Sequence, residues 1–216
     1  MGTQFQIPEG ARLRVITVAG NIHVTGEQRT DIDIEPADRR LSVVDDGRVI
    51  ETRTKSKNLY LRVPAGLNVS VGTMSGEVRL EGLVGSVKVS TVSGKVEIDA
   101  TTGDADIRSI SGTIIIGDCG GRCRANTKSG RIELGHVAGA VKAHTMSGRI
   151  EVGTAGEDEV ELKSISGSIE VRVDEGRLPQ AKLRSLSGKT RCGCPQGNDF
   201  EIKASSLSGS IDIQGR

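Results

Sequence analysis

The sequence predicts an all-β protein that folds as a flattened parallel β-solenoid, with about 18 residues and two short strands in each coil. Three observations predict this fold. The dipeptide Ser-Gly recurs at a nearly constant spacing, the segments between recurrences alternate apolar and polar residues, and similar apolar residues return at the same place in each repeat. Each coil of a solenoid buries its apolar face only against its neighbours, so like residues stack on like.

The repeating unit is [T/S]-x-S-G, and eight copies lie between Thr73 and Gly209. Consecutive serines are 18 residues apart in the first five copies, after which the spacing lengthens to 19, 21 and 21. Ser and Thr beside Gly hydrogen-bond to nearby backbone and so favour tight turns. We expect a stacked turn ladder made of Ser75, Gly76, Ser93, Gly94, Ser111, Gly112, Ser129, Gly130, Ser147, Gly148, Ser166, Gly167, Ser187, Gly188, Ser208 and Gly209.

Alternating segments such as residues 77–81 and 86–90 predict the strands. Counted from the first Thr or Ser of a unit, positions six and eight are apolar in almost every copy, from Val78 and Leu80 to Ile211 and Ile213. This period of two is typical of a half-buried strand. The composition fits a thin aliphatic core, because only 1% of the residues are aromatic and none is Trp.

Residues 1–72 repeat the pattern less regularly. The segment 17–24 copies the unit with Ala19 in place of serine, residues 31–35 and 59–63 read as strands, and residues 45–47 read as a turn. We expect one domain over residues 1–216, with irregular coils in 1–72 and regular coils in 73–216. An antiparallel β-sandwich is the alternative fold, but it gives no reason for columns of similar residues at a spacing of 18.

The two ends of the predicted solenoid differ. Terminal repeats normally become atypical and polar. Phe5 and its irregular surroundings provide a plug at the N-terminal side, whereas Ile211 and Ile213 continue the inner columns to within a few residues of Arg216. We therefore expect self-association through an end-to-end interface that contains Ile211 and Ile213, giving dimers or filaments.

Charge and composition argue against several partners. The 29 Lys and Arg residues nearly balance the 28 Asp and Glu residues, and the aromatic side chains that stack on bases are almost absent, so we expect no nucleic-acid partner. No run of about 18 apolar residues predicts a transmembrane segment. The N-terminus resembles no signal peptide, so we expect a cytoplasmic location, with a place near the inner face of the envelope as one option.

Metal sites are not expected either. Cys119, Cys123, Cys192 and Cys194 would supply four zinc ligands, but the two pairs belong to coils about 19 Å apart at about 4.8 Å per coil. We expect them to pack as small apolar thiols. The turns also lack the Gly-x-Asp step of calcium-binding nonapeptide repeats, so we expect no calcium and no cofactor.

No catalytic constellation is recognisable. The three histidines, His23, His136 and His144, are isolated in the sequence, and no nucleophile–base–orienter set forms, so we expect no enzyme. The outward glutamates at position seven (Glu97, Glu133, Glu151 and Glu170) lie close to Lys95, Arg131 and Arg149 at position five, as ion pairs that support a sheet. Two stacked rows of hydroxyls leave an ice-binding solenoid as a less favoured alternative.

Taken together, residues 73–78 (TMSGEV), their seven successors and the entry segment 63–69 (VPAGLNV) resemble the putative-adhesin β-strand-repeat family, also called Toastrack. The resemblance runs from residues 5–10 to the last coil. It implies a non-enzymatic bacterial β-solenoid with no established catalytic or ligand residues, whose relatives often accompany envelope-stress systems. We therefore expect a scaffold or interaction module that binds protein partners, with a surface adhesin as the alternative.

Overall fold

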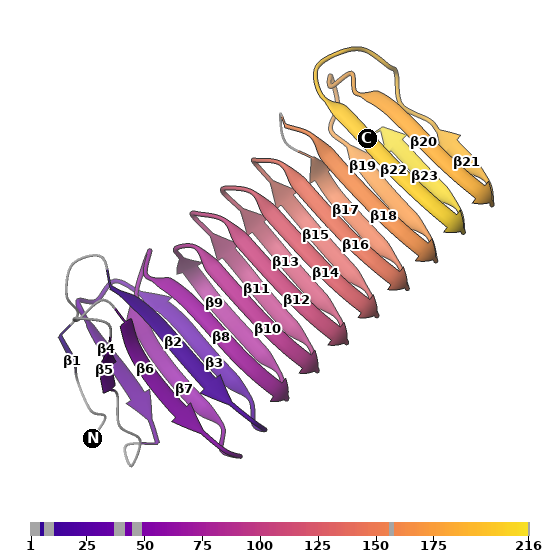
Figure 1. Cartoon of the computed structure of the whole chain (residues 1–216). Coiled ribbons are helices and arrows are strands. Elements are labelled where there is room, and N and C mark those ends of the chain that lie inside the picture. Colours follow the sequence, from indigo (N-terminus) through magenta and orange to yellow (C-terminus); the bar gives the residue numbers. More distant parts are fainter. Residues whose placement is uncertain (1–4, 7–10, 37–41, 45–48, 156–157, 216) are drawn as a thin grey trace.

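Two β-sheets wound from one chain face each other in the computed structural model, which describes residues 5–6, 11–36, 42–44, 49–155 and 158–215 (Figure 1). Sheet I has eleven strands and sheet II has twelve, and the described residues contain no helix. Most neighbouring strands are parallel, and the chain alternates between the sheets in successive strands of each regular coil. The predicted parallel β-solenoid is confirmed, and the parallel pairing excludes the antiparallel sandwich.

Sheet I contains, in spatial order, β20 (Gln180–Ser187), β22 (Glu201–Ser208), β18 (Val160–Ser166), β16 (Val141–Ser147), β14 (Cys123–Ser129), β12 (Ala105–Ser111), β10 (Val87–Ser93), β8 (Asn68–Ser75), β2 (Arg12–Thr17), β6 (Val49–Thr54) and β5 (Ser42–Val44). Sheet II contains, in the opposite spatial order, β1 (Phe5–Gln6), β4 (Asp31–Glu35), β7 (Leu59–Pro64), β3 (Ile22–Glu27), β9 (Val78–Val84), β11 (Val96–Thr101), β13 (Ile114–Cys119), β15 (Ile132–Val137), β17 (Ile150–Ala155), β19 (Ile169–Val173), β23 (Ile211–Gly215) and β21 (Thr190–Cys192).

Equivalent residues of neighbouring coils lie opposite one another, which produces the predicted columns. In sheet I, Ala105 is aligned with Cys123, which is aligned with Val141. In sheet II, Ile114 is aligned with Ile132. All five side chains are buried, and one cluster of buried aliphatic side chains runs from Ala11 to Ile213. Removing this apolar surface from water, at about 25 cal/mol per Å², is the main stabilising contribution.

The spatial order of the coils departs from their sequence order at both ends. The β2–β3 coil lies between the later β6–β7 and β8–β9 coils. The β22–β23 coil likewise lies between the β18–β19 coil and the earlier β20–β21 coil. Antiparallel strands cover the N-terminal end, where β4 pairs with β7, β1 with β4 and β5 with β6. The strands β20 and β21 therefore form the C-terminal end.

This order corrects the expected end interface. Ile211 and Ile213 lie on β23, which has β19 on one side and β21 on the other, and they are 1% and 0% exposed. They continue the inner columns because their coil is internal. The outermost coil is the atypical one, since it places Thr190 and Cys192 opposite these two isoleucines. At the other end, the backbone of Phe5 is paired in β1, while the turn expected at 45–47 lies outside the described residues.

Candidate interaction surfaces

The expected turn ladder lies along one edge of the solenoid. Its first hydroxyl is buried in most units. In some units it closes the turn: the Oγ1 of Thr73 donates to the carbonyl oxygen of Ser75 at 3.0 Å, and Thr91 repeats this contact. In other units, such as those of Ser109 and Ser164, the buried hydroxyl has no hydrogen-bond partner within the described residues. Glycine N–H groups donate to the serine carbonyl of the adjoining coil, as Gly112 does to Ser129 at 3.1 Å. Only the serine row faces outward. The two exposed hydroxyl rows of the ice-binding alternative are therefore reduced to one.

The ladder requires glycine because neighbouring coils are closest there. The φ angles of Gly76, Gly94, Gly112, Gly130, Gly148 and Gly167 lie between 122° and 149°, a region that L side chains rarely adopt. A Cβ added to Gly130 would also lie 1.9 Å from the carbonyl oxygen of Gly112.

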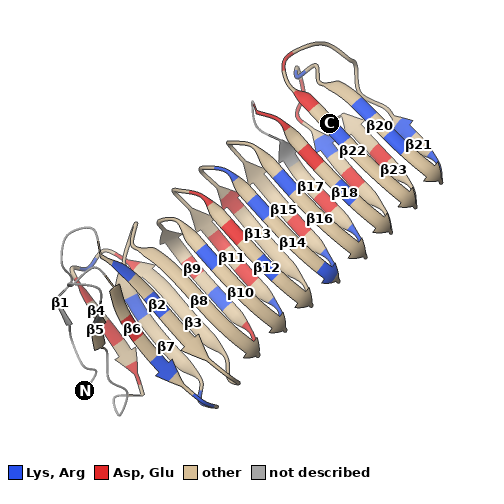
Figure 2. Cartoon of the chain, viewed as in Figure 1, with Lys and Arg blue, Asp and Glu red and all other residues tan. Residues whose placement is uncertain are grey.

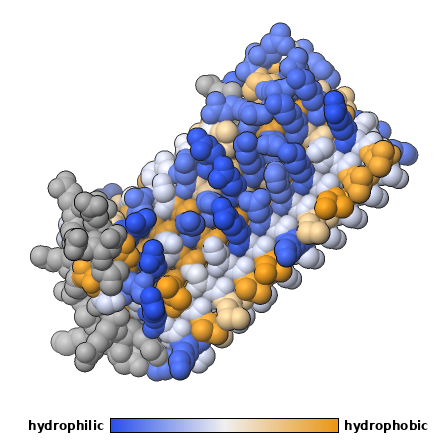
Figure 3. All heavy atoms as spheres, in the orientation of Figure 1, coloured by the Kyte–Doolittle hydropathy of each residue, from blue (hydrophilic) through white to orange (hydrophobic). Residues whose placement is uncertain are grey.

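An exposed apolar row, which we call the edge row, follows the same edge (Figure 3). It is formed by the residue between the buried hydroxyl and the outward serine of each unit, or its equivalent in the first unit. Eight of the twelve large apolar side chains that are well exposed in the described residues belong to it. In spatial order the row contains Val18, Met74, Val92, Ile110, Met146, Ile165, Leu207 and Leu186, which are 41–81% exposed, and Lys128 takes the equivalent position between Ile110 and Met146.

Sequence reasoning about the unit missed the edge row because it treated the x of [T/S]-x-S-G as unconstrained. The signal was present, since an outward position of an alternating strand should be polar, and this one is apolar in all but one of nine units.

The outward face of sheet I next to the edge row is strongly basic. We define the basic face as the edge row, its equivalent Lys55, and the two outward columns beside them on the ten parallel strands. These positions hold twelve basic residues: Arg14, Arg53, Lys55, Lys88, Arg108, Arg124, Lys128, Lys142, Lys163, Lys182, Arg184 and Lys203. Only Glu51, Asp106 and Glu161 are acidic. Because the whole chain has a net charge of +1, acidic residues are in excess elsewhere.

Several charges of the basic face are locally paired. Glu161 accepts from Lys163 and contacts Lys142 at 3.0 Å, and these hydrogen bonds lower the pKa of Glu161 to about 2. Glu201, at the margin of the face, pairs with Lys182 and Lys203. Five cations have no side-chain ion pair or side-chain hydrogen bond within the described residues: Lys55, Lys88, Arg124, Lys128 and Arg184.

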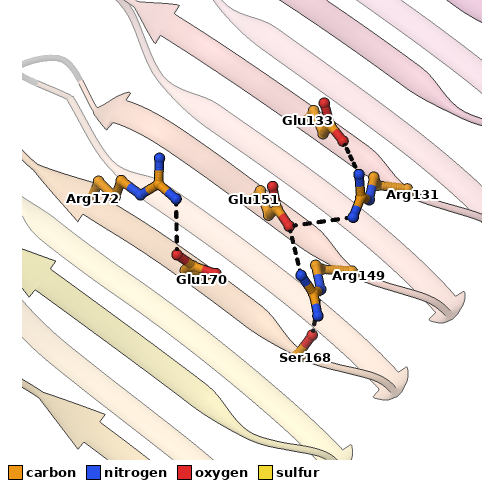
Figure 4. Close-up of polar contacts among 7 residues, drawn as sticks. All are labelled: Arg131, Glu133, Arg149, Glu151, Ser168, Glu170 and Arg172. Atoms are coloured by element: carbon orange, nitrogen blue, oxygen red, sulfur yellow. Dashed lines mark hydrogen bonds and ion pairs between the residues drawn. The ribbon is translucent and has the colours of Figure 1, made fainter.

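The outward face of sheet II also carries ion pairs (Figure 4), and Figure 2 colours the basic residues blue and the acidic residues red. The expected pairs between positions five and seven are confirmed: Lys95 contacts Glu97 at 2.6 Å, and Arg131 contacts Glu133 at 2.5 Å. Figure 4 shows that the pairs also bridge strands. The contacts drawn there are Arg131–Glu133, Arg131–Glu151 at 3.8 Å, Arg149–Glu151 at 3.0 Å, Arg149–Ser168 at 3.2 Å and Arg172–Glu170 at 3.2 Å.

The four cysteines are free and lie in two pairs. Cys119 and Cys123 are buried, and the interaction between the two thiols lowers the pKa of Cys119 and raises that of Cys123. Cys192 and Cys194 have their sulfurs 3.3 Å apart in the outermost coil. Five inter-strand steps, rather than the expected four coils, separate β13 from β21, because the β22–β23 coil is inserted between them.

The remaining polar groups include hydroxyls, thiols and the histidines. The hydroxyl and thiol hydrogen bonds of the described residues involve backbone groups, one another or an arginine. His23 contacts Glu81 at 2.8 Å, whereas His144 is half-buried in sheet I, where burial lowers its pKa. In the part of the chain that the structure describes, no group of three His, Cys, Asp or Glu side chains is arranged to hold a metal, and no helix could cross a membrane.

A family model and one solved structure agree with this fold. The family model described as Toastrack DUF4097 matches residues 6–192. A crystal structure of a "putative adhesin" from Bacteroides fragilis aligns over 100% of this chain and 96% of its own, with a TM-score of 0.57 and 19% identity, which shows a shared fold. A "putative cell adhesion protein" from Clostridium sporogenes covers both chains fully at a TM-score of 0.29 and 8% identity, too low to support an argument. No curated protein sequence matches.

Proposed function

The chain belongs to the Toastrack DUF4097 family, and from this premise we propose that it is a non-enzymatic β-solenoid scaffold that binds protein partners, including further copies of itself. Its described residues form a repeating framework with columns of outward side chains, and several of their hydroxyls and thiols form hydrogen bonds within that framework. Such a framework presents side chains at fixed spacings of about 4.8 Å, which suits recognition by an extended partner surface.

The observation that carries self-association is the open edge of β20. This strand has eight residues and pairs with β22 on one side, so among the described residues one row of its backbone N–H and C=O groups has no strand partner. Its inner residues Ala181 and Leu183 are only partly buried. Long unpaired edges recruit further strands, and the same edge on two chains can pair antiparallel as a closed, two-fold dimer.

A single substitution tests this edge. The N–H of Gln180 donates to the carbonyl of Phe200 toward β22, so the alternation of a strand directs the N–H of Ala181 to the open side. Ala181→Pro removes that donor without breaking a ladder bond, and Ala181→Val is the matched control that keeps it. We expect light scattering behind size exclusion to show a dimer for wild type and Ala181→Val and a monomer for Ala181→Pro. A wild type that stays monomeric at 100 μM would contradict self-association, since this concentration is on the order of the dissociation constants of weak, transient complexes.

Surface adhesion is the second candidate, favoured by the description of the Bacteroides fragilis relative. It requires export, whereas the scaffold proposal includes a location in the cytoplasm near the inner face of the envelope, in a system that responds to envelope stress. Fractionation of the native host with an antibody against the chain separates the two candidates. Protein outside the inner membrane would favour the adhesin.

A further inference from the structure

The edge row and the basic columns beside it form one continuous surface. The row spans eight steps between strands, about 38 Å at about 4.8 Å per step. The two columns next to it place Lys and Arg within the same outward face over most coils, and five cations of the face lack a partner within the described residues. Apolar and cationic side chains are therefore presented together, along most of the solenoid.

The two kinds of side chain meet in a shallow groove of about 720 Å³ on the C-terminal half of this face. Met146 and Ile165 of the edge row line one part of it, and Arg108, His144 and Lys163 line another. A ligand lying there would contact alkyl groups and positive charge at once.

We propose that this face binds the surface of an anionic lipid bilayer, with the edge row entering the boundary between headgroups and acyl chains and the basic columns contacting headgroup phosphates. Binding of this type grows with buried apolar area and with attraction to anionic lipids. Each Lys or Arg held near such a surface contributes about fivefold to the affinity.

Other occupants fit this face less well. A nucleic acid would not contact the eight aliphatic side chains favourably, and the face offers no aromatic side chain on which its bases could stack. A second copy docked through the same face would bring two basic faces together, and like charges repel. A folded protein partner is recognised through anchors in central pockets, whereas the row is a periodic ridge without deep pockets. A fluid, negatively charged surface with an apolar interior matches both features of the face.

Flotation of the full-length protein with vesicles provides the test. The probes are vesicles of phosphatidylcholine alone and vesicles containing phosphatidylglycerol at a molar fraction of about 30%, a composition chosen because anionic lipids set the surface potential. We expect binding to the anionic vesicles at least tenfold tighter than to the neutral ones, and weaker binding at raised salt.

Two variant pairs separate the contributions. Met146→Gln with Ile165→Gln keeps the charge and should weaken binding at least tenfold, whereas Leu83→Gln, an exposed apolar residue outside the row, should leave it within twofold. Arg124→Gln with Lys128→Gln should weaken binding about 25-fold. Its control, Arg131→Gln with Arg149→Gln, removes the same charge from sheet II and should change binding within twofold. Circular dichroism confirms that each variant is folded.

Three results would overturn the proposal: no flotation of wild type with anionic vesicles, equal binding to both kinds of vesicle, or loss of vesicle binding in the charge variant alone while the edge-row variant binds normally. In the last case heparin, as a soluble polyanion, should bind as tightly as the vesicles, and the face would be a polyanion site. Ala181→Pro tests the dimer separately, because β20's open edge is not needed for vesicle binding.

Discussion

Replacing Gly130 with alanine should destabilise the solenoid by about 3 kcal/mol. The φ of 148° at this residue costs an L side chain about 1–3 kcal/mol. The added Cβ would lie 1.9 Å from the carbonyl oxygen of Gly112, and relieving such an overlap costs about 1–3 kcal/mol. Alanine also lowers the conformational entropy of the unfolded chain, which offsets this destabilisation by about 0.4–1 kcal/mol.

Three other glycines isolate these contributions. Gly72 has an ordinary φ and open space, so Gly72→Ala should stabilise by about 0.4–1 kcal/mol. Gly66 has a φ of 80° and open space, so its alanine variant should destabilise by about 1 kcal/mol. Gly135 has no left-handed φ, but its Cβ would lie 2.3 Å from the carbonyl oxygen of Gly117, which predicts about 1–2 kcal/mol.

Urea unfolding followed by far-ultraviolet circular dichroism measures the series, because the chain has no Trp. At about 2–3 kcal/mol per molar urea, Gly130→Ala should lower the midpoint by about 1 M. The close stacking of turns would be refuted if Gly130→Ala were no less stable than Gly66→Ala, or if Gly72→Ala were the most destabilised of the four.

Three further predictions concern the core, the charges and the thiols. Ile114→Ala should destabilise the fold by about 2–5 kcal/mol in the same urea assay, because Ile114 is fully buried. Ile115→Ala is the control and should cost under about 1 kcal/mol, because Ile115 faces outward. Equal costs would contradict the assignment of Ile114 to the inner face of the strand and Ile115 to the outer face. Carboxyl NMR should give Glu161 a pKa of about 2. Because this pKa lies below the unfolded value of about 4.3, the contribution of Glu161 to the free energy of unfolding is complete above about pH 4.3 and is lost as the pH falls toward about 2. The loss should be at most about 1 kcal/mol for a pair near the surface, and Glu161→Gln should abolish it. Ellman's reagent should modify Cys192 in the folded protein but Cys119 only on unfolding, since the first is partly exposed and the second is 1% exposed; rapid reaction of a Cys192→Ser variant would count against this.

The coil architecture could be predicted from the sequence because its determinants are local and repeated. Eight copies of one unit fix the register, and the columns from Val78 and Leu80 onward show which side chains are buried. Strands 31–35 and 59–63 were also predicted with bounds within one residue of the observed ones. Alternation and turn chemistry act within a few residues, so a single sequence contains them.

The order of the end coils could not be predicted in this way. Ile211 and Ile213 continue the inner columns whether their coil is last or next to last, since each coil recognises only its neighbours. The basic face was hidden for a similar reason: a net charge of +1 averages over both sheets, whereas the partition of charge between them depends on which strands stack together.

The exchanged order of coils at the two ends has a consequence for how such a chain changes in length. In the middle of the array, an 18-residue unit can be gained or lost without altering any other pairing, because each coil meets an equivalent neighbour on both sides. At the ends this freedom is absent, because the coils there are out of sequence order. The first complete coil lies between two later coils, and the last coil lies between two earlier ones. We therefore expect the interior to tolerate the gain or loss of a coil, and the two ends to tolerate neither.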